Sequence, residues 1–342
     1  MHFNARLFNI NKLLIFAGTV AVVLLIIFWF WWGDKEIDVA NTANGKPISE
    51  NSLPESPISG ISCQNASRRP ISVMMAADPE TRPLSGIGEA DIVFEMPVTP
   101  NGITRFMAVF QCFEPAEIGS IRSARNDFMP LAAGLGSIYA HWGGEREALE
   151  KLNNGIIDNI DAMKYEGTVF YRKKEAPMPH NGFTNIGEIL DQSKKLNYNL
   201  DSEFEGYLHE EKEIKKNIAN IAEEIPIDYP RPYNVRWIYD NQSGEYKRFR
   251  DGKQEIDKNT NEQVSARVIA VIKTSSKYLN KDYISVATQG EGEAVVYQNE
   301  VKMSGKWFKN PSRLDSKLFF YDNEGKEIVF APGKMWIEII AD

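Results

Sequence analysis

Hydrophobic and polar residues follow different patterns along this 342-residue chain, and the most pronounced pattern lies near its start. Residues 13–32 read LLIFAGTVAVVLLIIFWFWW and include no charged side chain. About 20 apolar residues in a helix span a hydrocarbon core roughly 30 Å thick, so this stretch predicts a transmembrane anchor. A cleaved signal peptide is the alternative, but its apolar run is only about 7–15 residues long and ends at a small-residue site rather than in aromatic residues.

Flanking charges predict the orientation of this anchor. Arg6 and Lys12 precede it, and acidic residues predominate directly after it. The positive-inside rule therefore places residues 1–12 in the cytoplasm and the rest of the chain on the outer side of the membrane. The predicted localisation is the cell membrane, crossed once, with extracytoplasmic C-terminal domains.

A polar segment separates this anchor from the first predicted domain. Residues 33–68 are rich in Asn, Ser, Pro and Gly, a composition that predicts a flexible linker. Residues 69–200 alternate strand-like and helix-like segments around Asn101-Gly102, a dipeptide typical of hairpin turns. This region predicts a mixed α/β domain with a central hairpin. Its expected strands are 71–77, 91–98, 103–113 and 137–141, and its expected helices are 126–135, 145–153 and 184–196.

A second domain is predicted from a change of pattern further along the chain. Residues 201–232 predict a connecting segment, in which the charged stretch 203–224 is expected to form a solvated helix. Residues 233–342 contain short aromatic or β-branched runs between Gly- and Asn-containing turns, which predicts a mainly β domain, either a sandwich or a barrel. The fold class predicted for the whole chain is therefore α+β.

Composition and charge exclude several classes of protein. With 43% hydrophobic and 25% charged residues, the chain is neither disordered throughout nor collagenous. Its net charge of -8 disfavours nucleic acid as a partner, because such binding draws on Lys and Arg that neutralise phosphates. Cys63 and Cys112 lack metal-type spacing, and outside the cytoplasm a disulfide is the simplest reading of the pair. Two separate buried thiols are the alternative.

Arginine is concentrated in the first predicted domain. Arg105 lies inside an apolar strand, and Arg122 and Arg125 belong to the stretch IGSIRSARND. The planar guanidinium group presents paired donors that match a carboxylate or a phosphate. We therefore expect these three residues to bind an anionic group.

Two other interpretations of this stretch stay open. The arginines could pair internally with Glu89, Asp91 or Glu95 and form a structural ion network. Ser123 could act as a nucleophile, but the G-x-S-x-G pattern of a nucleophile elbow does not surround it. Ser123 is therefore expected beside the arginines as a ligand-binding residue, and no catalytic residue follows from these patterns.

Two further polar clusters precede predicted helices. In the first, His141 is followed by Gly143 and Gly144, which would let the backbone approach a ligand closely. The second contains His180 and Asn181 in a turn before the helix at 184–196. We expect these five residues to complete the ligand site, although a buried histidine and ordinary turns explain both clusters as well.

No metal site or cofactor follows from the sequence. Of the four histidines, His2 lies on the cytoplasmic side and His209 lies in a charged segment. His141 and His180 together with a carboxylate such as Glu95 are the remaining combination, and H-E-x-x-H spacing does not occur. In the second domain, Arg248 and Arg250 are expected on a polar rim.

A series of motifs resembles the YerB-like lipoprotein family, which is known largely as a domain of unknown function. The resemblance runs from about residue 69 to residue 340 and implies an organisation in two parts, without implying a molecular function. The chain departs from the lipoprotein pattern because its apolar segment is not followed by a lipidation cysteine. The matching stretches include RRPISVMM, RPLSGIGEADIVFE, NGITRFMAVFQ, IGSIRSAR, HWGGEREAL, PHNGFTN, YKRFRDGKQEID, GEGEAVVYQNEVKMSGKWFK and FAPGKMWIEI.

The order of strand, hairpin, Ser-Ile-Arg and GG-E-x-x-A-L helix is more loosely similar to LytR-CpsA-Psr phosphotransferases. Those membrane-anchored enzymes transfer lipid-pyrophosphate-linked glycans with the help of Arg and a metal-binding Asp. Here Thr104 stands where the Asp is expected, and Ser123-Ala124 replaces an Arg-Asp pair. The resemblance therefore implies an Arg-lined anion pocket in an envelope protein, but not the catalytic set.

Three functions follow as hypotheses. The first is a protein anchored in the cell membrane through residues 13–32 that binds an anionic envelope polymer. The second is a phosphotransferase or hydrolase of envelope glycans, in which His141 or His180 transfers a proton. The third is a non-enzymatic scaffold that binds a protein partner through the β domain.

Overall fold

The computed structural model describes residues 42–43, 46–47, 53–211 and 221–342 of this chain. The predicted cytoplasmic segment 1–12 and the predicted anchor 13–32 lie outside these residues. In the part of the chain that is described, no helix combines the length and the apolar character needed to cross a membrane. Strands β1 (Thr42–Ala43) and β2 (Lys46–Pro47) form an antiparallel pair by themselves, and residues 53–342 form a separate compact unit.

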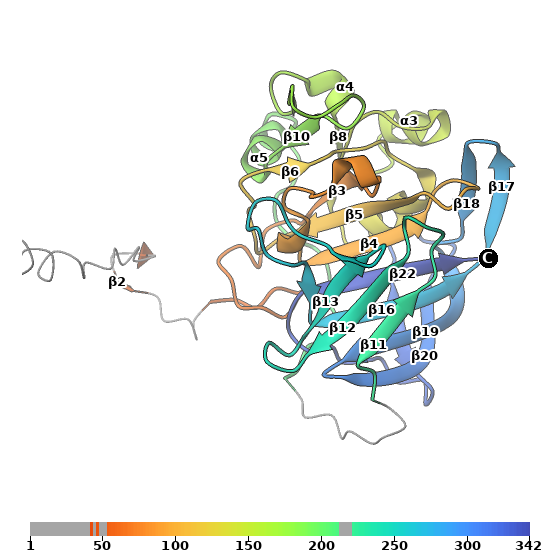
Figure 1. The fold of residues 1–342 in the computed structure, drawn as a ribbon. Coiled ribbons are helices and arrows are strands. Elements are labelled where there is room, and N and C mark those ends of the chain that lie inside the picture. Colours follow the sequence, from red (N-terminus) through yellow and green to blue (C-terminus); the bar gives the residue numbers. More distant parts are fainter. Residues whose placement is uncertain (1–41, 44–45, 48–52, 212–220) are drawn as a thin grey trace, which may run out of the picture. The chain divides into compact units, whose positions relative to one another are not determined.

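A mixed ten-stranded sheet runs through the described residues of this larger unit (Figure 1). Strand β22, near the end of the chain, pairs in parallel with β4 of the first half and with β16 of the second half. The order across the sheet is β21-β20-β19-β16-β22-β4-β5-β3-β7-β8. The strands are β3 (Ile71–Ala76), β4 (Ile92–Pro97), β5 (Thr104–Phe110), β7 (Ile138–His141), β8 (Asn159–Asp161), β16 (Val268–Thr274), β19 (Gly290–Gln298), β20 (Val301–Lys309), β21 (Phe319–Asp322) and β22 (Met335–Ala341).

Smaller sheets add to this one. A five-stranded sheet contains β11 (Glu224–Ile227), β12 (Val235–Asp240), β13 (Glu245–Arg250), β14 (Lys253–Gln254) and β15 (Ser265–Ala266). A three-stranded sheet contains β6 (Ile118–Gly119), β9 (Tyr171–Arg172) and β10 (Gly182–Thr184). Strands β17 (Ser276–Asn280) and β18 (Tyr283–Val286) form an antiparallel hairpin.

Short helices connect these strands. Helix α5 begins where the Asn185 side chain accepts a hydrogen bond from the Glu188 amide at 2.9 Å, the usual way in which Asn caps a helix. The α-helices are α2 (Met129–Gly134), α3 (Arg146–Asn153), α4 (Ala162–Tyr165) and α5 (Ile186–Lys195). The 3-10 helices are η2 (Pro79–Thr81), η3 (Ile87–Glu89) and η4 (Asn126–Phe128).

Apolar side chains are buried on both faces of the large sheet. One face packs against α2 and α3, for example through Leu131 and Leu152. The other face packs against the five-stranded sheet (Figure 1). In this second layer of the core, the ring of Trp237 contacts the ring of Trp336 of β22. Because central strands such as β3 are covered on both sides, they are apolar throughout rather than alternating.

Several predicted elements are confirmed. Strands β4 and β5 form the expected hairpin, closed by a hydrogen bond from the Val98 amide to the Ile103 carbonyl at 2.8 Å. The predicted disulfide is present, and it joins Cys63 to Cys112. The mixed class, with strands predominating, is confirmed, whereas the domain boundaries at residues 200 and 233 stay predictions. The ten-stranded sheet contains strands from both predicted regions.

The predicted flexible linker 33–68 is wrong at its C-terminal end. Residues 53–68 pack against the folded unit: Ile58 is buried in its core, and the disulfide at Cys63 ties the segment to the end of β5. The Tyr207 amide also donates to the Pro57 carbonyl at 2.9 Å. Polar composition concealed these contacts because the backbone and buried serines make several of them, for example Ser59, whose hydroxyl donates to Asp91 at 3.0 Å.

The predicted helix at 203–224 is also wrong over the residues that the structure describes there. Residues 203–211 form no helix, and the Phe330 backbone exchanges hydrogen bonds with Leu208 and Glu210 at 2.8 and 3.0 Å. Glu224 begins strand β11. Backbone pairing with distant strands replaces the local hydrogen bonds that a solvated helix would have made.

Candidate functional site

The candidate site forms beyond the carboxyl end of β3, where segment 120–125 takes the place of β7 beside that strand. The Ala76 amide donates to the Ser120 carbonyl and the Arg122 amide donates to the Met74 carbonyl, both at 2.9 Å. On the other side of β3, antiparallel β5 places Arg105 opposite Ala76. The topology therefore brings Arg105 to the edge of the sheet that Arg122 also occupies. Ligands of α/β sheets commonly bind beyond the carboxyl ends of strands.

Arg105 is a buried cation without a nearby carboxylate among the described residues. Its side chain is only 3% exposed, and it donates one hydrogen bond, from Nη1 to the Ser123 carbonyl at 3.3 Å. Its Nε is buried and has no hydrogen-bond partner in the described part of the chain. Burial, together with the neighbouring guanidinium groups of Arg125 and Arg122, lowers the pKa of Arg105 to about 9.

Arg122 and Arg125 flank this buried residue. Arg122 is the more accessible of the two, with 19% of its side chain exposed, and its Nε lies 4.0 Å from Asp78 Oδ2. The Arg125 guanidinium lies 5.0 Å from the centre of the Tyr283 ring and donates to the Ala124 carbonyl at 2.9 Å. Burial lowers the pKa of Arg125, and the negative charge of Glu145 partly opposes this shift. Three guanidinium groups are thus close enough to destabilise one another.

The predicted internal pairing of these arginines with Glu89, Asp91 or Glu95 is wrong. The Asp91 carboxylate accepts hydrogen bonds from the Gln111 and Cys112 amides at 2.7 and 3.0 Å. Glu89 accepts from Asn259 at 3.0 Å, and Glu95 binds arginines of β13. Within the described residues, Asp78 is the sole carboxylate within 4.0 Å of any of the three arginines.

His141 does not join the arginines. It is fully buried, and its Nδ1 lies 2.8 Å from the Gly143 carbonyl while its Nε2 lies 3.3 Å from Asn159 Oδ1. The Gly143 amide donates to Asp161 at 2.8 Å, and Gly143 has a φ of +59°, which favours glycine. A side chain at Gly144 would press on Ala124, because its Cβ would lie 3.1 Å from the Ala124 Cβ. These three residues therefore shape a turn and the core beneath it.

The two residues of the second predicted cluster, His180 and Asn181, have different surroundings. Asn181 Oδ1 accepts a hydrogen bond from Arg172 at 2.8 Å, which assigns this residue to the local fold. His180 instead faces the arginine edge: burial, followed by the charge of Arg122, lowers the pKa of its imidazole. Of the nine predicted ligand-binding residues, the structure thus brings together Arg105, Arg122, Ser123, Arg125 and His180.

Residues that the patterns did not single out as site residues complete this edge. Asp78 and Glu80 follow β3, and they look like ordinary turn formers in the sequence beside Pro79 and Pro83. Tyr139 is fully buried near Arg105 and Arg125, and burial raises the pKa of its phenol. The sequence could have indicated Asp78 and Glu80 as site residues, because polar residues directly after a buried strand commonly lie at a binding edge.

The predicted polar rim at Arg248 and Arg250 is wrong, because both side chains are buried between the two large sheets. Arg248 is 0% and Arg250 is 2% exposed. Arg248 binds Glu95 of β4 and Glu338 of β22, and it binds Glu255 at 2.7 Å. Both arginines of this network are paired with carboxylates and offer no free charge to a ligand, although Glu338 Oε2 has no hydrogen-bond partner within the described residues.

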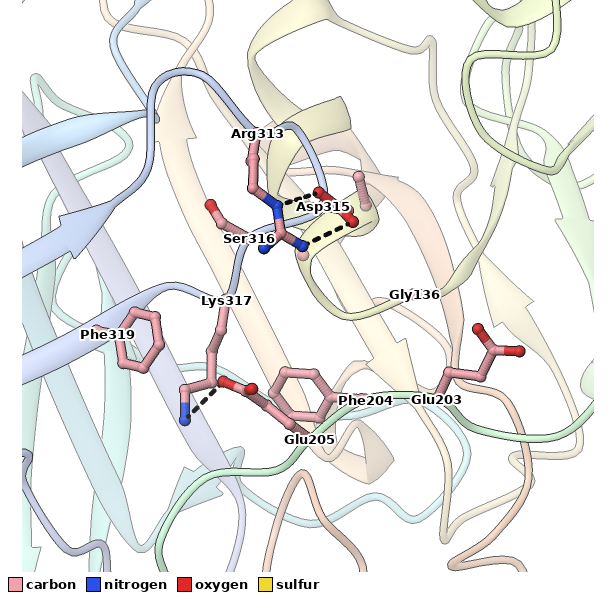
Figure 2. A pocket seen from close by; sticks show the side chains of 11 residues that line it. Gly136, Glu203, Phe204, Glu205, Arg313, Asp315, Ser316, Lys317 and Phe319 are labelled. Carbon is pink, nitrogen blue, oxygen red and sulfur yellow. Dashed lines mark hydrogen bonds and ion pairs between the residues drawn. The ribbon is translucent and has the colours of Figure 1, made fainter.

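A cavity of about 310 Å³ elsewhere on the molecule is a weaker candidate (Figure 2). Its charged side chains are already paired: Arg313 binds Asp315 at 3.1 Å, and Lys317 lies 3.4 Å from Glu205. Figure 2 shows both pairs, with dashed lines joining Arg313 to Asp315 and Lys317 to Glu205. Neutralised charges give an ionic ligand little to bind, so the arginine edge is the better candidate.

The chain matches the family described as "Protein of unknown function (DUF3048)", with the N-terminal domain over residues 58–199 and the C-terminal domain over residues 225–337. "Putative lipoprotein YerB" of Bacillus subtilis (strain 168) is 29% identical over 294 residues, which are 84% of this chain and 86% of the relative. A crystal structure of YerB protein from Bacillus subtilis matches with a TM-score of 0.76 at 27% identity, covering 84% of this chain and 97% of that chain. The resemblance to the YerB-like family, predicted from the motifs, is confirmed.

Proposed function

Because this chain belongs to the DUF3048 family of proteins of unknown function, we propose a function from its own residues: binding of an anionic group, a phosphate or a carboxylate, of a cell-envelope polymer. The ligand would contact Arg122 directly. Arg105 and Arg125 would add positive potential from behind it.

One observation carries this proposal. Three guanidinium groups share one sheet edge, and among the described residues a single carboxylate, that of Asp78, lies within 4.0 Å of any of them. Burying a charge without a partner is unfavourable, so proteins rarely retain such an arrangement for stability alone. A bound anion would remove that penalty, because charge-assisted hydrogen bonds to guanidinium are strong.

Location at the cell envelope is part of the proposal. The relative YerB is described as a lipoprotein, a type of protein held at a membrane. In this chain, residues 13–32 would take the place of the lipid as a single-pass anchor, with the N-terminus in the cytoplasm. A disulfide between Cys63 and Cys112 supports an oxidising compartment for the folded unit.

Calorimetric titration of the detergent-solubilised full chain tests the anion site. Inorganic phosphate and pyrophosphate represent phosphoryl ligands, and succinate represents carboxylates. We expect Arg122→Gln to weaken binding at least about tenfold, because it removes a charged donor worth about 1.5–3 kcal/mol. Arg313→Gln is the matched control, since its guanidinium is exposed and already paired with Asp315.

Equal affinity of Arg122→Gln and the unmodified chain would refute the anion site. The proposed topology is tested separately with a phosphatase reporter that is active only outside the cytoplasm. Fused after residue 342, it should be active in intact cells. Activity confined to a reporter that works inside the cell would overturn the extracytoplasmic location.

A further inference from the structure

Two carboxylates and an imidazole form a second group of side chains at the arginine edge, which adjoins Arg122 through Asp78 and is separate from the buried ion network. Asp78 and Glu80 lie after β3, and His180 lies in the loop before β10. One potential ligand atom from each residue lies within 4.8 Å of the other two. Residues about 100 positions apart in the chain therefore converge with two carboxylates and one imidazole.

Two atoms of this group lack the partners that buried polar atoms normally have. Asp78 Oδ2 and His180 Nδ1 are both shielded from solvent, and neither has a hydrogen-bond partner within the described residues. Asp78 Oδ2 lies 4.0 Å from Arg122 Nε, which is beyond hydrogen-bond length. Since buried polar atoms are nearly always satisfied, these two atoms point to a missing ligand.

We propose that Asp78, Glu80 and His180 bind a divalent transition-metal ion. Two carboxylate oxygens and one imidazole nitrogen suit Mn²⁺ or Zn²⁺ better than Mg²⁺ or Ca²⁺, which prefer oxygen ligands alone. Three protein ligands leave coordination positions open, as in metal sites that bind a further ligand. Glu80 is exposed, so the ion can enter from solvent.

The metal site and the anion site would reinforce each other. Asp78 and Glu80 do not fully balance the three guanidinium groups, and a divalent ion would raise the local positive charge further. An anion bridging the ion and Arg122 would relieve that repulsion, so phosphate should strengthen metal binding. This coupling rests on the proposed function, whereas metal binding by itself does not.

Electron paramagnetic resonance of Mn²⁺ tests the metal site on the full chain, purified without a histidine tag. Loss of the free-ion signal measures binding. We expect one saturable site and at least about tenfold weaker binding in Glu80→Gln and in His180→Gln, because each loses a ligand. Glu175→Gln is the matched control, an exposed carboxylate in the same loop as His180 but outside the cluster.

Glu80→Gln keeps the test decisive, because an exposed side chain can be replaced without unfolding the protein. Equal Mn²⁺ affinity in Glu80→Gln, His180→Gln and the unmodified chain would overturn the proposal, and so would absence of Mn²⁺ binding with and without phosphate. Phosphate binding measured without metal separates the two sites. If it stays intact while Mn²⁺ binding is absent, the metal site fails and the anion site stands.

Discussion

Arg250 of β13 donates from Nη2 to both carboxylate oxygens of Glu95 of β4 at 2.7 Å, across 155 positions of sequence. Arg248, two positions earlier on the same buried face of β13, binds the same carboxylate. Neither Arg248 nor Glu95 is exposed to solvent. The pairing joins the five-stranded sheet to the ten-stranded sheet, because β13 and β4 belong to different sheets.

Replacing Glu95 should destabilise this junction. Glu95→Gln would leave two buried guanidinium groups short of one carboxylate, so we expect a loss of about 3–5 kcal/mol in the free energy of unfolding. Glu338→Gln is the control from the same network. Glu338 pairs with Arg248 alone, and Arg248 keeps Glu95 and Glu255 as partners, so this change should cost less than the one at Glu95, which pairs with both arginines. Urea denaturation followed by tryptophan fluorescence should show a loss below about 1 kcal/mol for this control, and equal losses would contradict the prediction.

Glu255 should make stability depend on acidic pH. Burial alone would raise its pKa, but Arg250 and Arg248 outweigh burial and lower the pKa to about 2. Because this folded-state pKa lies below the unfolded value of about 4.5, the ion pairs stabilise the fold above about pH 4.5. That stability is lost as the pH falls towards 2. Thermal melting between pH 6 and pH 2.5 should show a shallower decline for Glu255→Gln, and parallel curves would count against this role.

Reduction of the disulfide should lower stability measurably. Cys63 and Cys112 are 49 residues apart, and closing a loop of this length stabilises the fold by about 4 kcal/mol on the chain-entropy model. Urea denaturation with and without dithiothreitol should reveal a decrease of about 2–4 kcal/mol. The double variant Cys63→Ser, Cys112→Ser serves as the control, because reductant should leave its midpoint unchanged. A reductant effect of equal size in that variant would exclude the disulfide as the cause.

Replacing Arg105 should stabilise the fold and weaken anion binding. Arg105→Met removes a buried charge that lacks an acidic partner among the described residues, so the free energy of unfolding should rise by about 1–4 kcal/mol. The same variant should bind pyrophosphate more weakly, because a positive charge behind Arg122 is lost. Urea denaturation and calorimetric titration measure the two effects. A destabilised variant with unchanged pyrophosphate affinity would show that Arg105 is structural.

Local patterns predicted most of the elements around the site. The Asn101-Gly102 turn predicted the β4–β5 hairpin, and apolar runs predicted β3 and β7, because these features depend on neighbouring residues alone. The charged stretch 203–211 predicts a helix, and this prediction is wrong. Its backbone bonds to Phe330 instead, a partner that no local pattern reveals.

The sequence predicted the arginines of the candidate site but not which histidine joins them. Guanidinium density predicted Arg105, Arg122 and Arg125 together, and the structure places them at one edge. His141 could not be separated from His180 by sequence, because both precede helices in polar turns. Burial separates them: His141 has both ring nitrogens occupied in the core, whereas His180 meets Asp78 and Glu80.

By itself, the sequence determined the elements, the family and the disulfide partners, because apolar periodicity, motif order and two cysteines are properties of local or countable residues. Only the tertiary structure decided which charges meet. It pairs Glu95 with Arg248 and Arg250, and within the described residues it leaves Arg105 Nε without a hydrogen-bond partner. The strength of an ion pair depends on distance and on exclusion of water, and both are set by how strands far apart in the chain pack together.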